Sequence, residues 1–175
     1  GGNATTVRIV DSSSYNMQVL TRAQFLHWWA GFSAVAVPVS PSFGMSVLGG
    51  PSLSPAVVNQ VLLQAGSPAH DTGQALYDLS AQYGIDDAYA LAVFGHESTY
   101  GLYGAGSVNH ALGNINCAGY LTCNGRFRWY ATWAEGYADF YHLIAHEYVA
   151  RGLATVQAIT PVYAPASEND VGAYI

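Results

Sequence analysis

A single carboxylic acid, Glu97, stands where its side chain could act in catalysis. The residues three, four and seven positions before it are Phe94, Val93 and Ala90, so on a helix the acid shares an apolar face. The segment 98–101 (Ser-Thr-Tyr-Gly) ends that helix one turn later, and the partial negative charge of a helix C-terminus disfavours an ionised carboxylate. We therefore expect this carboxyl group to have a raised pKa. An acid that keeps its proton near neutral pH can protonate a leaving oxygen, as the general acid of a glycosidase does.

The other acids of the sequence limit the mechanism. Between Glu97 and Glu135 the chain contains no Asp or Glu, whereas a two-carboxylate glycosidase needs a second acid roughly 5–10 Å from the first. Glu135 follows Thr132 in a capping-box pattern, and Asp86 and Asp87 are expected to cap the far end of the Glu97 helix, about 15 Å away. We expect Glu97 to act without a carboxylate partner from the segment that follows it. The alternative is a structural glutamate bonded to backbone or tyrosine groups.

Capping residues and glycine stops delimit the helices that must position Glu97. Thr21–Gln24 and Thr132–Glu135 match the capping box, and Ser54 with Pro55 is a cap followed by proline at the first helical position. Glycines that follow segments with apolar residues at helical spacing mark the helix ends. The predicted helices are 21–32, 54–66, 71–84, 86–98 and 132–151, followed by a short segment from Thr155 that breaks near Pro161 and a last helix from Ser167.

Three regions lack the helical period. Thr5–Val10 is typical of a strand at a sheet edge. Ser33–Pro51 is rich in Ser, Pro and Gly, which predicts a linker or a long surface connection. The segment 101–131 predicts loops with a small hairpin. The fold class is therefore mainly α, with a small irregular or β-hairpin lobe after the Glu97 helix. We expect residues 1–50 to contribute a strand, a helix and the connection, and 51–175 to form the main domain, in one compact unit.

The composition is acidic and aromatic. Of the 175 residues 51% are hydrophobic and only 9% are charged, there is no lysine, and the net charge is −6, which argues against nucleic-acid or anionic-membrane partners. Thirteen Tyr and four Trp suit flat contacts to sugars, although an aromatic core would give the same count. No run of 18 apolar residues occurs, so no membrane span is expected.

Cys117 and Cys123 enclose a short polar loop. Two cysteines this close, without a second pair, do not form a zinc site. A local disulfide is the preferred interpretation and implies an oxidising, secreted setting, and two free thiols are the alternative.

No metal or other cofactor is expected. The His-Glu pairs at 96–97 and 146–147 match only the first half of a zinc-binding HExxH motif, because the second histidine is replaced by Tyr100 and by Ala150.

The order of several motifs is similar to that of a known family. The motifs are Glu97-Ser98 with Gly101, Asn-His-Ala-Leu-Gly-Asn-Ile at 109–115, Phe-Arg-Trp-Tyr at 127–130 before Trp133, Tyr-Ala-Pro at 163–165, and the closing segment 169–175. In this order the chain resembles the bacterial glucosaminidase family of lysozyme-like peptidoglycan hydrolases, of the mannosyl-glycoprotein endo-β-N-acetylglucosaminidase type. The resemblance covers roughly 67–175. One departure is that the family commonly has Asn-Leu-Phe-Gly-Ile where this chain has Ala-Leu-Gly-Asn-Ile at 111–115.

The resemblance implies a lysozyme-like helical domain with Glu97 as the catalytic acid. Asn114 and Ile115 match the stretch that lines the sugar groove, and Tyr130 matches an aromatic residue near the acid. The full set of candidate substrate-binding residues is Tyr100, His110, Asn114, Ile115, Trp129 and Tyr130. For His110, the alternative is an ordinary surface-loop histidine.

The implied function is cleavage of β-1,4 bonds of peptidoglycan at N-acetylglucosamine. With one acid, the 2-acetamido group of the substrate could attack the anomeric carbon, oriented by Tyr130 or Asn114. Alternatives are a muramidase, a lytic transglycosylase in which Glu97 acts as acid and then as base, or a domain that only binds glycan. We expect a monomer that acts on peptidoglycan strands outside a bacterial cell or at its wall.

Overall fold

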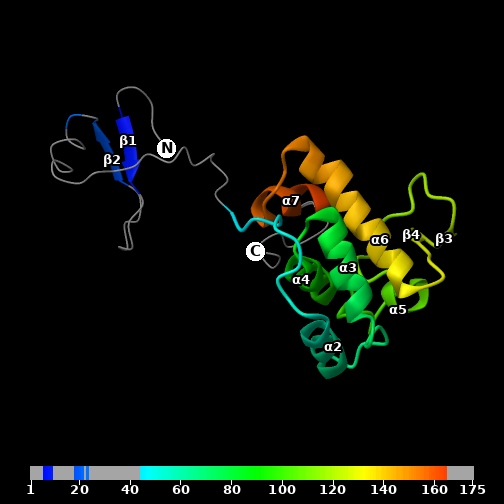
Figure 1. The fold of residues 1–175 in the computed structure, drawn as a ribbon. Helices are drawn as coiled ribbons and strands as arrows, with labels where there is room; N and C mark the ends of the chain where they lie inside the picture. Colours follow the sequence, from blue (N-terminus) through cyan, green and yellow to red (C-terminus); the bar gives the residue numbers. More distant parts are fainter. Residues whose placement is uncertain (1–5, 10–17, 22, 24–43, 165–175) are drawn as a thin grey trace. The chain divides into compact units, whose positions relative to one another are not determined.

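The computed structural model describes residues 6–9, 18–21, 23 and 44–164 of the chain. The chain divides into two units, Gly1–Ser42 and Phe43–Ile175, a boundary that the sequence analysis placed near residue 50. In the first unit, β1 (Thr6–Ile9) pairs antiparallel with β2 (Gln18–Thr21) (Figure 1), so the strand predicted for Thr5–Val10 is present. Thr21, predicted to begin a helix, is instead the last residue of β2, and residues 24–32 of that predicted helix lie outside the described residues, as does the helix predicted from Ser167.

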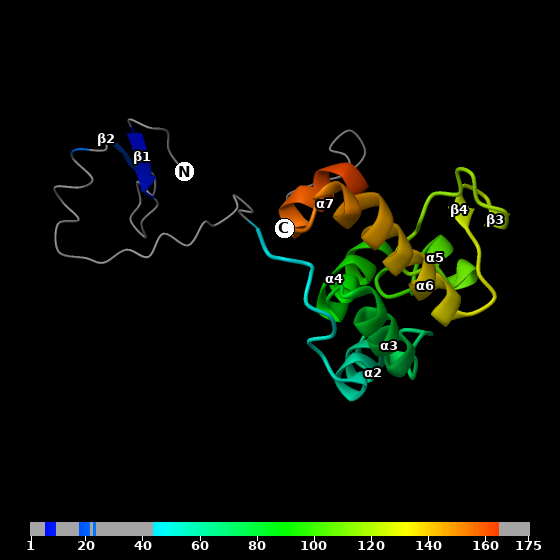
Figure 2. The same cartoon turned by 45° about the horizontal axis from the view of Figure 1, so that its top comes forward.

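The second unit is mainly helical, with one small two-stranded antiparallel sheet (Figures 1 and 2). Its elements are α2 (Pro55–Gln64), α3 (Gly73–Tyr83), α4 (Asp87–Ser98), α5 (Ala105–Asn109), β3 (Cys123–Asn124), β4 (Phe127–Arg128), α6 (Trp133–Leu143) and α7 (Val156–Tyr163). The predicted fold class, a helical domain with a small hairpin lobe after the Glu97 helix, is confirmed.

Side chains that the sequence placed at helix starts do cap these helices. Ser54 accepts a hydrogen bond from the backbone N–H of Val57, and Asp86 accepts one from the N–H of Ala88. Thr155 likewise caps α7. Each bond satisfies a backbone donor that the first helical turn leaves without a partner. The helix starts are therefore determined by local chemistry.

Two capping predictions differ in detail. The carboxylate of Glu135 accepts from the N–H of Ala131 instead of closing the box on Thr132, while Thr132 accepts from the N–H of Glu135. Asp87 is fully buried and does not cap α4. Its Oδ1 accepts from the N–H groups of residues 52 and 53, and burial raises its pKa. Asp87 therefore fastens the segment before α2 to the start of α4.

The predicted continuous helix 132–151 is divided. After α6, residues Ile144–Tyr148 form a π-helical turn and Val149–Arg151 a 3₁₀ turn. The predicted break near Pro161 is wrong, because α7 continues through this proline to Tyr163. The short helix α5 was also not predicted, since the sequence indicated only loops and a hairpin there.

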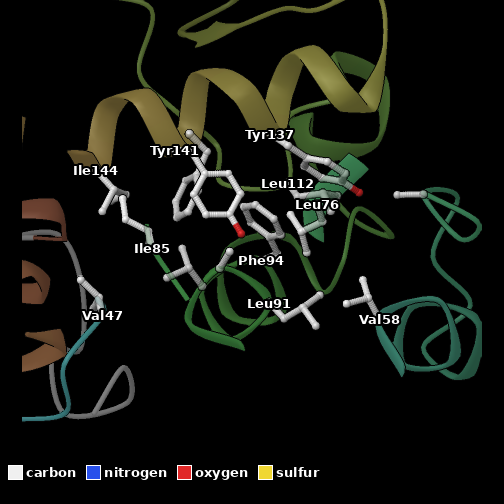
Figure 3. Close-up of a cluster of buried hydrophobic side chains, with 14 of the residues drawn as sticks. Val47, Val58, Leu76, Ile85, Leu91, Phe94, Leu112, Tyr137, Tyr141 and Ile144 are labelled. Atoms are coloured by element: carbon white, nitrogen blue, oxygen red, sulfur yellow. The ribbon is translucent and has the colours of Figure 1, made fainter. Parts of the chain in front are cut away.

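The core packs α4 against α6. Figure 3 shows Tyr137 and Tyr141 of α6 pointing toward Phe94 of α4, and these side chains are buried together with Ile144 of the π-helical turn. The rings of Phe94 and Tyr137 are stacked with centroids 5.6 Å apart, a favourable arrangement for aromatic pairs. This contact fixes the turn of α4 that precedes Glu97.

The segment before α2 is anchored to the helical unit. Val47 is completely buried, its N–H donates to the carbonyl of Ala154 at 3.1 Å, and its own carbonyl accepts from the N–H of Asp86 at 2.8 Å. The end of the predicted Ser33–Pro51 connection is therefore part of the core and not a surface linker.

Candidate active site

Glu97 lies in the last turn of α4, and Thr99 ends the helix in the left-handed conformation (φ 49°). The apolar residues that precede Glu97 on its face, Ala90, Val93 and Phe94, are buried as predicted. Glu97 itself is half-buried, not fully buried. The packed face of α4 thus ends in a carboxyl group at the boundary between core and solvent.

A cavity of about 750 Å³ opens beside Glu97; we call it the Glu97 groove. It is formed by the end of α4, the loop 114–118, the turn and second strand of the β3–β4 hairpin, the end of α6 with the π-helical turn, and the end of α7. Its lining residues are Glu97, Asn114, Ile115, Asn116, Ala118, Arg126, Phe127, Arg128, Leu143, Tyr148, Tyr163 and Ala164. Within the described part of the chain, Glu97 is the only carboxylate in this lining.

Asn114 is tied directly to the acid-bearing residue. Its Nδ2 donates to the backbone carbonyl of Glu97 at 2.7 Å, one of the carbonyls that a helix C-terminus leaves without a helical partner. Asn114 adopts a left-handed backbone conformation (φ 45°), which asparagine tolerates better than most residues. Its Oδ1 is buried and has no hydrogen-bond partner among the described residues. Asn114 thus lines the groove, while its side-chain oxygen is shielded from solvent.

The loop that carries Asn114 is held on both sides. The hydroxyl of Ser98, the last residue of α4, donates to the carbonyl of Leu112 at 2.9 Å. From α7, the Tyr163 hydroxyl donates to the carbonyl of Gly113 at 2.6 Å. The loop therefore keeps its position relative to both α4 and α7.

The β3–β4 hairpin forms another wall of the groove. The predicted disulfide between Cys117 and Cys123 is present. The N–H of Cys117 donates to the carbonyl of Arg126 at 2.8 Å, and the N–H of Arg128 donates to the carbonyl of Ile115 at 2.9 Å. The turn has Gly125 at φ 62°, the positive value that tight hairpin turns require. These contacts hold the hairpin backbone against the loop 114–118.

Two of the predicted aromatic residues lie elsewhere. Trp129 and Tyr130 line a second cavity of about 430 Å³, which we call the Tyr130 cleft. Its lining residues are Tyr120, Thr122, Trp129, Tyr130, Ala131, Glu135, Ala138, Asp139 and His142. The Tyr130 hydroxyl donates to Asp139, which also accepts from the Arg128 guanidinium at 2.7 Å. Burial, followed by the bond to Asp139, raises the pKa of Tyr130.

Tyr100 and His110 are also separated from the Glu97 groove. Tyr100 lines a third cavity of about 570 Å³ together with His96. His110 has its Nδ1 2.9 Å from the carbonyl oxygen of Tyr130 and its ring edge-on to Trp133. Of the predicted site residues, the structure brings together Glu97, Asn114 and Ile115.

Several groove residues were not among the predicted site residues. Arg126, Tyr148 and Tyr163 all line the Glu97 groove. Tyr163 belongs to a motif that the resemblance uses, so it offered a signal. Tyr148 belongs to none of the motifs, and nothing in the sequence distinguishes Arg126 from another turn residue.

In residues 44–164 and the short described strands, no group of three or more His, Cys, Asp or Glu side chains is placed to hold a metal ion. Among the helices that the structure describes, none has both the length and the apolar character needed to cross a membrane.

The fold is similar to that of known proteins at low sequence identity. A crystal structure of a catalytic mutant of S. aureus autolysin E in complex with the disaccharide NAG-NAM matches with a TM-score of 0.51 and 12% identity, covering 99% of this chain and 81% of that chain. The fold is lysozyme-like. A second crystal structure of S. aureus autolysin E, with the muropeptide NAM-L-Ala-D-iGlu, has a TM-score of 0.43 and 12% identity, with 88% and 70% covered. No family model and no curated protein sequence matches this chain.

Proposed function

We propose that this chain is a glycoside hydrolase that cleaves β-1,4 bonds of peptidoglycan at N-acetylglucosamine, with Glu97 as the general acid. The observation that carries the proposal is the Glu97 groove: a cavity of about 750 Å³ with one carboxylate among its described lining residues. This volume lies in the range of ligand-binding pockets. The similarity to the fold of an autolysin bound to NAG-NAM supports a glycan as the ligand.

The position of Glu97 suits proton donation. The carboxyl group is half-buried at the end of an apolar helix face, and both the apolar surroundings and the helix C-terminus favour its neutral form. A neutral carboxylic acid can transfer its proton to the glycosidic oxygen as the C1–O bond breaks. This transfer makes the departing sugar a neutral alcohol.

In the absence of a second carboxylate, the substrate itself supplies the group that attacks the anomeric carbon. We propose that the carbonyl oxygen of the 2-acetamido group attacks the anomeric carbon as the bond to the leaving oxygen breaks. Water then opens the cyclic intermediate and returns a proton to Glu97. Of the two residues predicted to orient the acetamido group, Asn114 is favoured because it lines the groove, whereas Tyr130 lines the other cleft.

The place of action follows from the same chemistry. We propose that the protein works outside a bacterial cell or at its wall, as a monomer. The disulfide between Cys117 and Cys123 supports an oxidising compartment, and peptidoglycan is an extracellular polymer.

Product analysis tests the reaction. Purified peptidoglycan is digested with the full chain, and the new ends are identified by mass spectrometry. Reducing N-acetylglucosamine ends are expected. Reducing muramic ends would replace the assignment by a muramidase, and anhydro-muramic ends by a lytic transglycosylase. Binding to peptidoglycan without any new ends would overturn the enzyme and leave a glycan-binding domain.

A further inference from the structure

The Glu97 groove contains an unusual share of the positive charge of this protein. The chain has five arginines, no lysine and a net charge of −6. Two of the five arginines, Arg126 and Arg128, line the groove. Because the whole molecule repels anions, a local cation in the groove has to be explained by what it contacts.

The charge of Arg128 is neutralised within the protein. Its Nη1 lies 2.7 Å from Oδ2 of Asp139, and its Nε donates to the carbonyl of Asn116 at 3.1 Å. Its guanidinium also stacks over the ring of Tyr120, 4.7 Å from the centroid. Arg128 therefore links the hairpin to α6, and its charge is balanced by a carboxylate.

Arg126 has a different environment. Its side chain is exposed, and its guanidinium lies over the ring of Phe127 at 4.9 Å. Among the described residues no carboxylate lies within 4.0 Å of it. Its backbone is fixed by the bond from Cys117 to its carbonyl and by the turn at Gly125. Arg126 is thus a positioned guanidinium in the groove, without an ionic partner in the described structure.

We infer that Arg126 binds a carboxylate of the substrate, so that the groove selects anionic glycans over neutral ones. This inference rests on the proposed function. A guanidinium presents paired N–H donors that match the two oxygens of a carboxylate. In peptidoglycan that carboxylate comes either from the lactyl group of muramic acid or from the stem peptide. The two sources share one chemistry and are separated by experiment.

Equilibrium binding tests the selection without requiring turnover. The full chain carrying Glu97→Gln is titrated with a neutral N-acetylglucosamine oligomer, with a NAG-NAM oligomer that has free lactyl groups, and with the same oligomer bearing stem peptides. Adding Arg126→Gln is expected to weaken binding of one or both carboxylate-bearing ligands by about three- to tenfold. Binding of the neutral oligomer should change less than about twofold. The ligand that loses affinity identifies the carboxylate.

Two variants serve as controls. Arg151→Gln removes the same charge from an exposed 3₁₀ turn that does not line the groove, and it should leave all three affinities unchanged. Arg126→Lys keeps the charge but loses the paired N–H donors, so it should retain only part of the preference. Equal losses for neutral and anionic ligands in Arg126→Gln, or an equal loss in Arg151→Gln, would overturn the inference.

This experiment can contradict the role of Arg126 without contradicting the proposed function, and the reverse is also true. A carboxylate preference in a chain that releases no new glycan ends would overturn the hydrolase and keep the role of Arg126. Peptidoglycan cleavage that is unaffected by Arg126→Gln, together with unchanged affinities, would keep the hydrolase and overturn this role. Absence of binding to all three ligands would overturn both.

Discussion

The Glu97 groove and the Tyr130 cleft contain similar side chains in different states of pairing. In the Tyr130 cleft, Asp139 accepts from Arg128 and Tyr130, and Glu135 accepts from the backbone of Ala131. In the Glu97 groove, the exposed Arg126 has no ion pair within the described residues. Each cavity is lined by three Phe, Tyr or Trp side chains, yet the polar groups of the cleft hold the hairpin to α6. A cation without an ion pair, more than aromatic content, therefore distinguishes the groove from the cleft.

The strongest test of this contrast removes the acid from the groove. Glu97→Gln is expected to lower turnover of peptidoglycan by about 10²-fold or more, because the amide cannot donate the proton, while the melting temperature stays within a few degrees. Glu147→Gln makes the same chemical change at an exposed position of the π-helical turn and should keep full activity. Turnover and thermal melts of both variants decide the matter, and unchanged wall clearing by Glu97→Gln would remove this residue from the mechanism.

A second test loosens one wall of the groove. The disulfide closes a loop with a sequence separation of six, so the chain-entropy model assigns it only about 2–3 kcal/mol. Replacing Cys117 and Cys123 by serine should lower activity proportionally more than it lowers the melting temperature, because Cys117 also holds the backbone of Arg126.

Activity and melting of the double mutant are measured on the same preparation. A large drop in melting temperature with full activity at low temperature would show instead that the disulfide supports the whole domain.

A third test addresses the cleft. Asp139→Asn removes the charge that pairs with Arg128 and accepts from Tyr130. We expect a loss of about 2 kcal/mol in the free energy of unfolding, with the turnover of the folded fraction changed less than about threefold. Urea unfolding and turnover are compared with Asp78→Asn, an exposed residue of α3. A loss of turnover as large as that of Glu97→Gln would give the cleft a catalytic role.

The smallest expected effect is a loss of stability at alkaline pH. Burial raises the pKa of Tyr137 to about 12, above the value of about 10 for an unfolded tyrosine. Above pH of about 10 the unfolded chain loses protons that the folded chain keeps, so the free energy of unfolding falls as pH rises toward 12. Burial shifts the pKa of Tyr130 in the same direction.

Urea midpoints measured from pH 8 to 11 follow this loss of stability. Tyr137→Phe and Tyr130→Phe should each reduce its slope. Identical slopes in the two variants and in the parent would contradict the role of these hydroxyls.

Local signals explain which parts of the fold could be predicted. Ser54, Asp86 and Thr155 begin helices because their side chains accept from nearby backbone N–H groups, and such contacts are encoded within a few residues. A π-helical turn at 144–148 and a five-residue helix at 105–109 leave no comparable signal, because both are shorter than the span needed to show a period.

The sequence predicts candidate site residues within one motif, but not which residues of different elements come together in one cavity. Glu97 and Asn114 were predicted because each belongs to a motif, and both line one groove. Tyr130 belongs to a motif as well, but its side chain is drawn into the other cleft by Asp139, a residue that no motif contains. The sequence does not show which cavity a hairpin residue faces when the deciding partner lies on another element.

The π-helical turn has a consequence for tolerance to deletion. Such a turn is equivalent to an α-helix with one residue inserted, so the residues before Ile144 and those after Tyr148 follow different angular phases. Losing one residue between them would rotate the 3₁₀ turn and all that follows by about 100°. Tyr148 would then leave the Glu97 groove, and the chain leading to α7 would start in a new direction. A single-residue deletion in this segment, far from Glu97 in sequence, would therefore misplace two sides of the groove while leaving the helix itself intact.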